Sequence, residues 1–212
     1  MKSSEAIETI VSAKRDDRPQ LVTISGGTCS GKSTFKENLQ RGLHIAGISV
    51  ATILLDEYFL DLSDRALPRQ NGKPVFDLPG AYHYDEFIRD ARRLCKGERI
   101  DMPRYNMTRN ERTYETTPVE PGKVIVAEGL FATSLLYGTG KLNRYQATHV
   151  YMDTPIETCL NRRIARDMSV YKIPESAIRN HWEKQIFPFW GPQQLNQKRL
   201  ATIIVREQDE RS

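Results

Sequence analysis

The stretch Gly26-Gly27-Thr28-Cys29-Ser30-Gly31-Lys32-Ser33 matches the pattern G-x-x-x-x-G-K-[ST], in which a glycine-rich loop wraps phosphate groups. Apolar residues at 21–24 precede it and predict a buried strand, while the spacing of Phe35, Leu39 and Leu43 after it predicts a helix. This context gives the pattern its physical meaning, because loop amides and the start of a helix both attract anions. The segment therefore predicts a loop that binds the phosphates of a nucleotide.

Each part of this loop has an expected task. Lys32 supplies a mobile cation to the phosphates, and the hydroxyl of Ser33 is the expected ligand of a phosphate-bound Mg²⁺. A chance match in a surface loop is the alternative, and the flanking strand and helix disfavour it. The residues expected to bind the nucleotide are Gly26, Gly27, Thr28, Cys29, Ser30, Gly31, Lys32, Ser33 and Thr34.

Length and charge exclude several classes of protein. A chain of 212 residues fits one α/β domain over 1–212, with room for a small lid. The net charge of +4 is mild and evenly spread, which argues against nucleic acid as the main partner. No apolar run approaches the length of a membrane span, and the first residues lack the apolar core of a secretory signal. We therefore expect a cytoplasmic protein without a membrane partner.

The cysteines do not form a recognisable framework. Cys29, Cys95 and Cys159 lie far apart and lack the spacing of metal ligands, so we expect free thiols. Cys29 lies inside the phosphate loop, where the helix dipole favours a reactive thiolate, although an inert loop residue is the plainer interpretation.

Strands and helices are expected to alternate along the chain. Uniformly apolar strands separated by helices predict a parallel sheet that helices cover on both faces. Residues 61–79 are expected to form a long loop, and residues 102–120 a β-hairpin or an extended substrate loop. A capping box is expected to open a helix at 154–157. Helices are predicted at 4–15, 32–46, 85–95 and 174–187, and strands at 21–25, 49–55, 123–127, 148–152 and 201–205.

Two acidic residues follow predicted strands, at the edge where parallel sheets carry their chemistry. Asp56 follows the second strand, and Glu128 follows the third apolar one. Phosphoryl transfer needs one carboxylate that takes the proton of the attacking hydroxyl and oxygen ligands that hold Mg²⁺. We assign the base to Asp56 and the metal side to Glu128, with Ser33 and Asp56 as further candidate ligands. Solvated strand ends are the alternative.

Other side chains are candidates for the remaining tasks. Arg163 and Arg166 lie on one face of a predicted helix, where they can stabilise charge on a transferred phosphate, or simply form a solvated face. We expect a lid over about 162–175. Tyr58 places aromatic surface beside the acceptor, and Asp77 and Tyr105 lie in long polar segments suited to acceptor recognition.

Several motifs, in this order, resemble the uridine kinase and phosphoribulokinase family over nearly residues 20–205. The resemblance implies a P-loop kinase fold, a three-layer α/β/α arrangement with a mainly parallel five-stranded sheet and a helical lid. It also implies ATP or GTP as phosphate donor, Mg²⁺, and a small hydroxyl compound as acceptor. The motifs are Ser25–Ser33, Leu55-Asp56-Glu57-Tyr58-Phe59, Phe76-Asp77-Leu78-Pro79-Gly80-Ala81, Pro103-Arg104-Tyr105, Ala127-Glu128-Gly129 and Arg162-Arg163-Ile164-Ala165-Arg166-Asp167.

The resemblance also implies roles for single residues. In uridine kinases the aspartate that matches Asp56 is the base, and the one that matches Asp77 holds the ribose. The tyrosine that matches Tyr105 packs near the nucleobase, and arginines that match Arg163 and Arg166 close over the phosphates.

The chain departs from this family pattern at the acceptor side. Tyr105-Asn106-Met107 stands where uridine kinases typically have Tyr-Asp-Phe, and Asn110 replaces a histidine that meets the pyrimidine. In the lid, residues 168–174 replace an Arg-Gly-Arg stretch and leave Lys172 to reach a phosphate. Arg104, Arg109 and Arg112 would suit an anionic acceptor, whereas a solvated hairpin of alternating charge explains them equally well.

The leading hypothesis is an ATP-dependent kinase that phosphorylates a hydroxyl of a nucleoside-like small molecule. Its acceptor-binding segments are expected at about 57–84 and 102–120, with Tyr58, Asp77, Tyr105 and Arg112 as contacts. A kinase of another acceptor, such as a sugar phosphate, pantothenate or nicotinamide riboside, is one alternative. A slowly hydrolysing nucleotide switch is the other. The choice between ATP and GTP, and between a monomer and a homo-oligomer, stays open.

Overall fold

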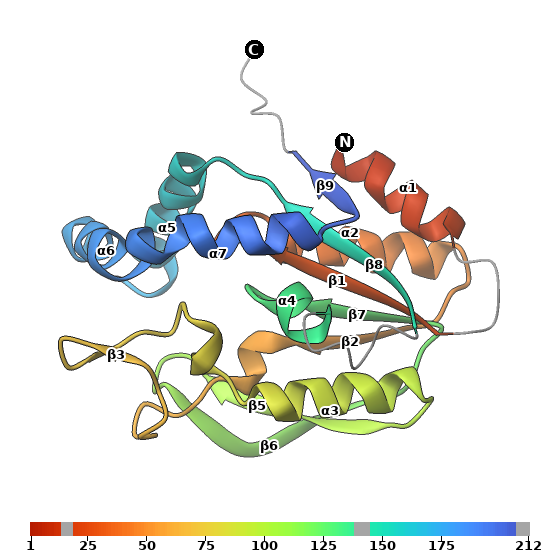
Figure 1. Cartoon of the computed structure of the whole chain (residues 1–212), viewed down its shortest axis with the longest axis horizontal. Coiled ribbons are helices and arrows are strands. Elements are labelled where there is room, and N and C mark those ends of the chain that lie inside the picture. Colours follow the sequence, from red (N-terminus) through yellow and green to blue (C-terminus); the bar gives the residue numbers. More distant parts are fainter. Residues whose placement is uncertain (14–18, 138–144, 207–212) are drawn as a thin grey trace.

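A five-stranded sheet lies at the centre of the molecule, and all of its strands are parallel (Figure 1). The computed structural model describes residues 1–13, 19–137 and 145–206. The strands are β1 (Gln20–Gly26), β2 (Val50–Leu54), β7 (Val124–Glu128), β8 (Gln146–Met152) and β9 (Ile203–Val205), in the spatial order β2-β7-β1-β8-β9. Every residue of β1 and β7 is buried, as their predominantly apolar sequences predict, and the buried residues include polar Thr23, Ser25 and Glu128.

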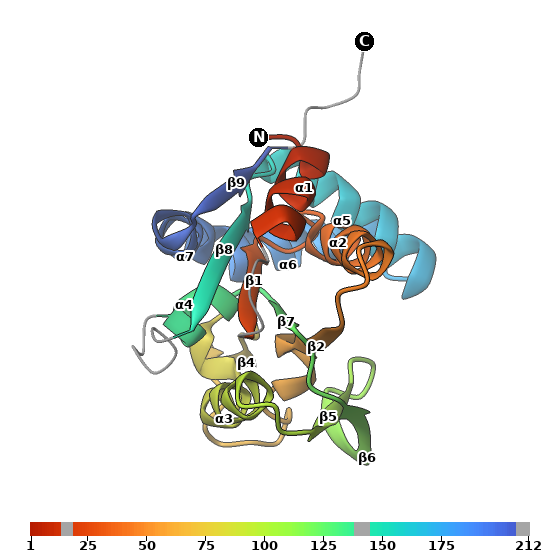
Figure 2. The same ribbon diagram turned by 90° about the vertical axis from the view of Figure 1, so that its right-hand side faces the viewer.

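Helices cover both faces of this sheet, so the predicted three-layer α/β/α arrangement is confirmed (Figure 2). On one face lie α1 (Ser3–Ala13) and α2 (Lys32–Ile45), which bury Phe35 and Leu39 against β1, β7 and β8. On the other lie α3 (Tyr84–Cys95) and α4 (Ala132–Tyr137), which bury Phe87 and Leu136 against β2 and β7. The short helix α4 is not predicted, because its few apolar residues carry too little periodicity.

The parallel register brings the chemically interesting strand ends to one edge of the sheet. Ile24 near the end of β1 pairs with Glu128 at the end of β7, and Leu54 at the end of β2 pairs with the same Glu128. Asp56 follows two residues later, in the 3₁₀ turn η1 (Leu55–Tyr58). The phosphate loop, Asp56 and Glu128 therefore lie at neighbouring strand ends, where open parallel sheets bind their ligands.

After β8 the chain forms α5 (Ile156–Val170), α6 (Glu175–His181), the π-helical turn η3 (Trp182–Ile186) and α7 (Phe187–Leu200). The predicted helix at 174–187 is therefore too short. Pro188 falls in the first turn of α7, where an absent N–H breaks no helical bond, and the wider turn before it resets the hydrogen-bond pattern. Pro188 therefore does not end the helical segment, because the π turn before it accommodates the proline.

Two antiparallel hairpins extend the molecule beside the sheet. β5 (Ile100–Asn106) pairs with β6 (Glu111–Val119), which realises the hairpin alternative for residues 102–120. The segment predicted as a long loop contains a small hairpin of β3 (Arg69–Gln70) and β4 (Lys73–Pro74), followed by the 3₁₀ turn η2 (Pro79–Ala81). These insertions lie near the carboxyl end of β2 and form one wall of the site.

The predicted capping box at the start of α5 does not form. Pro155 is the N-cap residue and no side chain caps the helix. Thr154 instead donates its hydroxyl to the carbonyl oxygen of Ser30, at 2.9 Å. This bond ties the start of α5 to the phosphate loop, so a tertiary contact replaces the local one.

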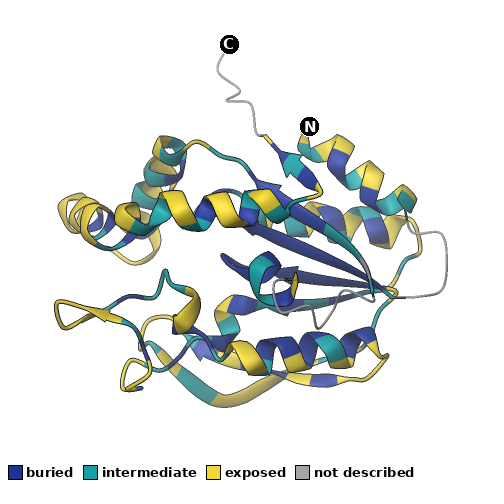
Figure 3. Cartoon of the chain, in the orientation of Figure 1, coloured by how far each residue is buried: buried dark blue, intermediate teal, exposed yellow. Residues whose placement is uncertain are grey.

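Burial follows the layers, with buried residues on the strands and inner helix faces and exposed ones outside (Figure 3). Within the described residues, no helix has both the length and the apolar character needed to cross a bilayer. Helices α2 and α3 each bury one face against the sheet and expose the other.

Candidate active site

The loop between β1 and α2 forms a tight turn around a concave surface. Gly26 and Gly31 have φ angles of +147° and +92°, which glycine adopts without strain, and Cys29 between them has +57°. The amide of Ser30 donates to the carbonyl oxygen of Gly27 at 3.2 Å and closes the turn. Consecutive amides in such a turn, together with the N-terminus of α2, favour an anion.

Polar groups at the start of α2 contact both the loop and the neighbouring strand end. The ammonium group of Lys32 donates to the carbonyl oxygen of Gly27 at 2.8 Å. The hydroxyl of Ser33 donates to Oε2 of Glu128 at 3.4 Å, and Nζ of Lys36 lies 3.8 Å from the same oxygen. The loop thus holds a cation and a hydroxyl ready for phosphate, beside a buried carboxylate.

The same groups fit a magnesium ion that arrives with a nucleotide. Within residues 1–13, 19–137 and 145–206, no group of three or more His, Cys, Asp or Glu side chains could hold a metal ion by itself. Ser33 and Glu128 supply hard oxygen donors, and phosphate oxygens and water commonly complete the shell of Mg²⁺. These two oxygen donors fit a metal ion whose shell phosphate oxygens and water would complete.

Asp56 has an environment that makes its carboxyl titrate close to neutrality. Water reaches the side chain through an open cavity, yet protein atoms surround the carboxyl, and this desolvation is the main cause that raises its pKa to about 6. The negative charge of Glu128 raises the pKa further, while Lys32 lowers it. Such a group is ionised at neutral pH and still basic enough to accept a proton.

A cavity of about 980 Å³ connects the phosphate loop with the hairpins and the helices after β8. It brings together seven of the residues that the sequence predicts for the site. Its lining combines basic side chains with several aromatic rings and the carboxylates of Asp56, Asp77 and Asp167. The predicted residues that line it are Thr28, Lys32, Asp56, Asp77, Tyr105, Arg163 and Arg166.

The arginines of α5 reach the cavity from the side opposite the hairpins. Nη1 of Arg163 donates to the hydroxyl of Thr28 at 3.4 Å, so the helix touches the phosphate loop directly. Buried Asp167 holds both guanidinium groups, with 3.3 Å to Nε of Arg163 and 2.8 Å to Nε of Arg166. The predicted lid thus presents two oriented positive groups to the cavity. Lys172 points elsewhere, since its ammonium donates to the carbonyl oxygen of Ser169.

Aromatic rings form the far end of the cavity. Phe59 stacks on Tyr82 with ring centroids 4.3 Å apart, and Phe76 and Tyr105 each lie 5.5 Å from Phe59. The hydroxyl of Tyr105 donates to the carbonyl oxygen of Leu60, so the ring is held in place. Beside them, burial raises the pKa of Asp77, and the charge of Arg163 partly offsets this. The arrangement offers a flat apolar surface next to carboxylates.

Two predicted contacts lie outside this group. Tyr58 is fully buried in the core, and its hydroxyl donates to Oδ2 of Asp90 at 3.0 Å. Arg112 forms a bidentate pair with Glu86, at 2.6 and 2.9 Å. Neither lines the cavity, so the structure does not bring either to the acceptor.

The other arginines of the hairpin are also paired on the outside. Nη1 of Arg104 lies 2.9 Å from Glu115, and Nη1 of Arg109 lies 3.4 Å from Glu111. The alternative of a hairpin with alternating charge therefore describes these side chains. Their charges are matched within the hairpin rather than directed at an acceptor.

Among the cavity-lining residues that sequence reasoning did not assign to the site, the aromatic residues and a histidine are notable: Phe59, Phe76, Tyr82 and His181. The aromatic residues of the 57–84 segment were a usable signal, because three of them recur in a stretch otherwise rich in turns. His181 ends α6, and burial and the charge of Arg163 lower its pKa. No local pattern distinguishes it from a solvated histidine.

Comparison with known proteins agrees with this geometry. The model described as the Phosphoribulokinase / Uridine kinase family matches residues 21–185. A uridine kinase of Leuconostoc citreum is 30% identical over 190 residues, which cover 90% of this chain and 88% of the relative. A structure from Silicibacter sp. TM1040, provisionally named a fructose transport system kinase, superposes with a TM-score of 0.73 at 18% identity, over 98% of this chain and 100% of that one.

A D-glycerate 3-kinase of Cryptococcus neoformans var. grubii superposes with a TM-score of 0.59 at 16% identity, over 88% of this chain and 83% of that one. At such identities the structural likeness shows the fold alone.

We predict that Tyr58→Phe destabilises the fold without affecting the cavity. The substitution removes a buried hydrogen bond to Asp90 and should lower the free energy of unfolding by about 1–3 kcal/mol, measured by urea denaturation. Tyr114→Phe, at an exposed tyrosine, is the matched control and should change nothing. Altered ligand affinity in Tyr58→Phe with unchanged stability would return Tyr58 to the site.

The raised pKa of Asp56 also predicts an effect on stability. Because the folded protein holds this proton more tightly than the unfolded chain does, ionisation of Asp56 opposes folding as pH rises through about 6. Asp56→Asn should therefore raise the thermal unfolding midpoint of the ligand-free protein at pH 8, and the gain should vanish toward pH 4. Solvent access makes the effect modest. A lower midpoint at pH 8 would contradict the assignment.

Proposed function

The chain belongs to the phosphoribulokinase and uridine kinase family, and we propose that it transfers the terminal phosphate of ATP to a hydroxyl of a neutral, nucleoside-like acceptor. Family membership makes the protein a kinase and implies ATP as the donor. One observation carries the choice of acceptor. The cavity leads from the phosphate loop past Asp56 to a pocket that combines aromatic rings with a second carboxylate, Asp77.

On the donor side, the loop residues 26–34 hold the phosphates. Lys32 exchanges the carbonyl of Gly27 for phosphate oxygens, and Arg163 and Arg166 stabilise the charge that develops on the transferred group. Mg²⁺, when bound, neutralises phosphate charge, and Ser33, Glu128 and Asp56 are the residues that would hold it. Asp167 keeps both arginines oriented before the substrate arrives.

On the acceptor side, Asp56 acts as the base. The acceptor oxygen attacks the terminal phosphorus, the bond between that phosphorus and the oxygen of ADP breaks, and the hydroxyl proton passes to the Asp56 carboxylate. The pKa of about 6 supports this role, because the group is ionised before the reaction and can hold the proton afterwards. Lys32, which lies close enough to lower that pKa, links the base to the phosphate loop.

The charge of the acceptor pocket favours a neutral molecule. In this proposal the donor phosphates occupy Lys32, Arg163 and Arg166, which leaves Asp56 and Asp77 to repel an anionic acceptor. The hairpin arginines that could attract an anion are paired with Glu86, Glu111 and Glu115. The stacked rings of Phe59 and Tyr82 suit a flat heterocycle, and Asp77 suits the hydroxyls of a sugar. We therefore favour a nucleoside over a sugar phosphate or pantothenate.

Three segments complete the proposal. Segments 57–84 and 102–120 supply the acceptor wall, and residues 162–175 serve as the lid that excludes water from the transferred phosphate. All three line the same cavity, through Phe59, Tyr105 and Arg163 among others.

Asp56→Asn should reduce turnover on the order of 10²-fold or more, with nearly unchanged affinity for MgATP, because loss of a base affects the chemical step. Initial rates with the preferred acceptor and calorimetric titration with MgATP measure the two quantities. Asp101→Asn, which changes an exposed carboxylate outside the cavity lining, is the control. Unchanged turnover in Asp56→Asn would remove this residue from the mechanism.

The pH dependence of kcat/KM supplies an independent check. A base works when deprotonated, so the wild-type value should fall as pH decreases through about 6, where Asp56 gains its proton. The residual activity of Asp56→Asn should lack this limb. The same acid limb in both proteins would assign it to another group.

Acceptor choice is measured by ADP release from MgATP with separate acceptors. We expect strong stimulation by uridine or cytidine and little by ribulose 5-phosphate or pantothenate, with mass spectrometry identifying the phosphorylated product. Phosphorylation of an anion alone would contradict the charge argument. Equal ADP release with and without every acceptor would favour a hydrolysing switch instead.

A further inference from the structure

Trp190 of α7 packs directly against the phosphate loop. A Cβ atom added to Gly27 would lie 1.9 Å from Cη2 of Trp190 and within 2.7 Å of two more atoms of the same ring. Real carbon atoms do not approach so closely, so the indole lies flush against the backbone of this glycine. The contact joins two segments that are far apart in the sequence.

Neither the phosphate-loop pattern nor the backbone conformation requires a glycine at position 27. Position 27 is an unrestricted position of G-x-x-x-x-G-K-[ST], and Gly27 is not among the glycines with positive φ. Alanine could adopt its backbone conformation. The space filled by Trp190 is the feature that excludes a side chain there.

The Trp190 contact lies next to the loop atoms that bind Lys32 and Arg163. The carbonyl oxygen of Gly27 accepts the hydrogen bond of the Lys32 ammonium at 2.8 Å, and the next residue, Thr28, accepts one from Arg163 at 3.4 Å. The indole therefore supports the peptide unit that fixes Lys32. A shift of Gly27 would move the carbonyl and, with it, the resting position of the ammonium.

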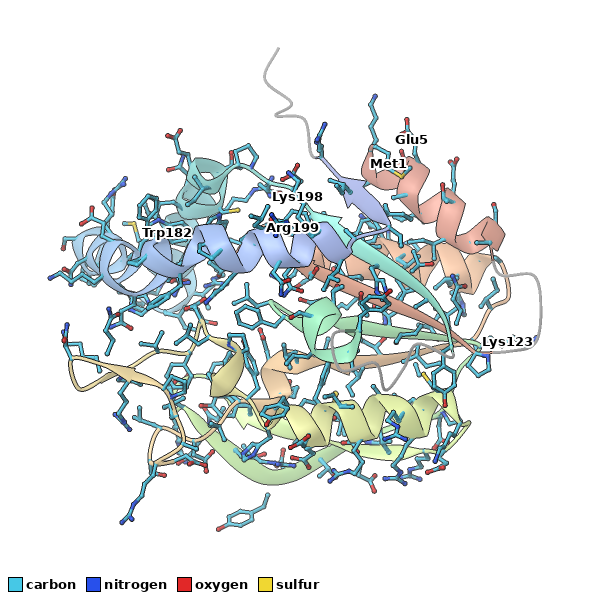
Figure 4. All side chains as sticks on the ribbon, viewed as in Figure 1. Met1, Glu5, Lys123, Trp182, Lys198 and Arg199 are labelled. Carbon is cyan, nitrogen blue, oxygen red and sulfur yellow. The ribbon has the colours of Figure 1, made fainter. Side chains whose placement is uncertain are left out.

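Trp190 is itself held by its surroundings. Its ring centroid lies 5.3 Å from that of Trp182, which is buried in a small cluster with Cys159 and Ile186. Figure 4 labels Trp182 near the end of α7 at which η3 joins the helix. Because the π-helical turn sets the rotation of α7 relative to α6, it helps to direct Trp190 at the loop.

We propose that Trp190 is a positioning residue for phosphate binding, which sets the shape of the loop at Gly27 and thereby the position of Lys32. This role rests on the proposed function only in that the loop must bind MgATP. Trp190 need not touch the nucleotide, since it acts through the backbone of Gly27.

A pair of size-complementary substitutions tests the contact. Gly27→Ala should weaken MgATP binding at least about tenfold, because its methyl group displaces either the loop or the indole. Trp190→Ala should weaken it about threefold to tenfold, and Trp190→Phe by less. Combining Gly27→Ala with Trp190→Ala should restore affinity to within about threefold of Trp190→Ala alone, because the methyl group then has room.

Calorimetry with MgATP measures affinity, and thermal unfolding verifies that each variant is folded. Gly191→Ala, on the next residue of the same helix and with no atom near the added methyl group, should match the wild type. Additive losses in the double variant would overturn the proposal, because a glycine needed for close approach of phosphate gains nothing from removal of the indole. Failure of the wild type to bind MgATP would contradict the proposed function instead.

A second measurement applies if Gly27→Ala does not fold. The chain has two tryptophans, so Trp182→Phe leaves Trp190 as the single one. Saturating MgATP should change its fluorescence, because Lys32 leaves the Gly27 carbonyl when phosphate binds. Unchanged emission in a variant that binds MgATP by calorimetry would overturn the proposal.

Discussion

The parallel pairing of β1 with β7, and of β7 with β2, is the constraint on which the site depends. This register places the end of β1, Glu128 and the turn that carries Asp56 at adjacent strand ends. A loop that binds anions and two carboxylates that would repel them are thereby held within electrostatic reach of each other. Lys32 partly balances the opposition, since it lowers the pKa of Asp56 while Glu128 raises it. Repulsion between the carboxylates of Asp56 and Glu128 remains in the ligand-free protein, and a magnesium-bound nucleotide would reduce it.

Basic groups, carboxylates and aromatic rings line the same cavity. Lys32, Arg163 and Arg166 make the phosphate end basic, and buried Asp167 orients the two arginines. The acceptor end combines aromatic surface with Asp77, whose pKa is raised by burial. Asp77 also lies within electrostatic reach of Arg163, Lys32 and Arg166, so the proposed acceptor surface borders the basic groups. Trp190 contacts the loop at Gly27 and does not line the cavity.

What the sequence predicts, and what it does not, follows from how local each feature is. The phosphate loop, the buried strands and the positions of Asp56 and Glu128 depend on short patterns and on strand ends, and the fold and family expected from them are confirmed. Tyr58 and Phe59 are neighbours in a tight turn, and periodicity cannot tell which ring enters the core and which enters the cavity. The bidentate pair of Arg112 with Glu86 joins the hairpin to a helix distant in sequence, and no local pattern indicates it. The contact between Trp190 and Gly27 likewise exists only in three dimensions.

The most direct test follows the terminal phosphate itself. The protein is incubated with ATP labelled at the γ-phosphate, Mg²⁺ and a neutral nucleoside, and the label is traced after a single turnover. Transfer predicts that the label appears on a hydroxyl of the nucleoside, at a rate far above that of inorganic phosphate release. Label that appears only as inorganic phosphate, at the same rate with and without nucleoside, would contradict transfer to the acceptor beside Asp56.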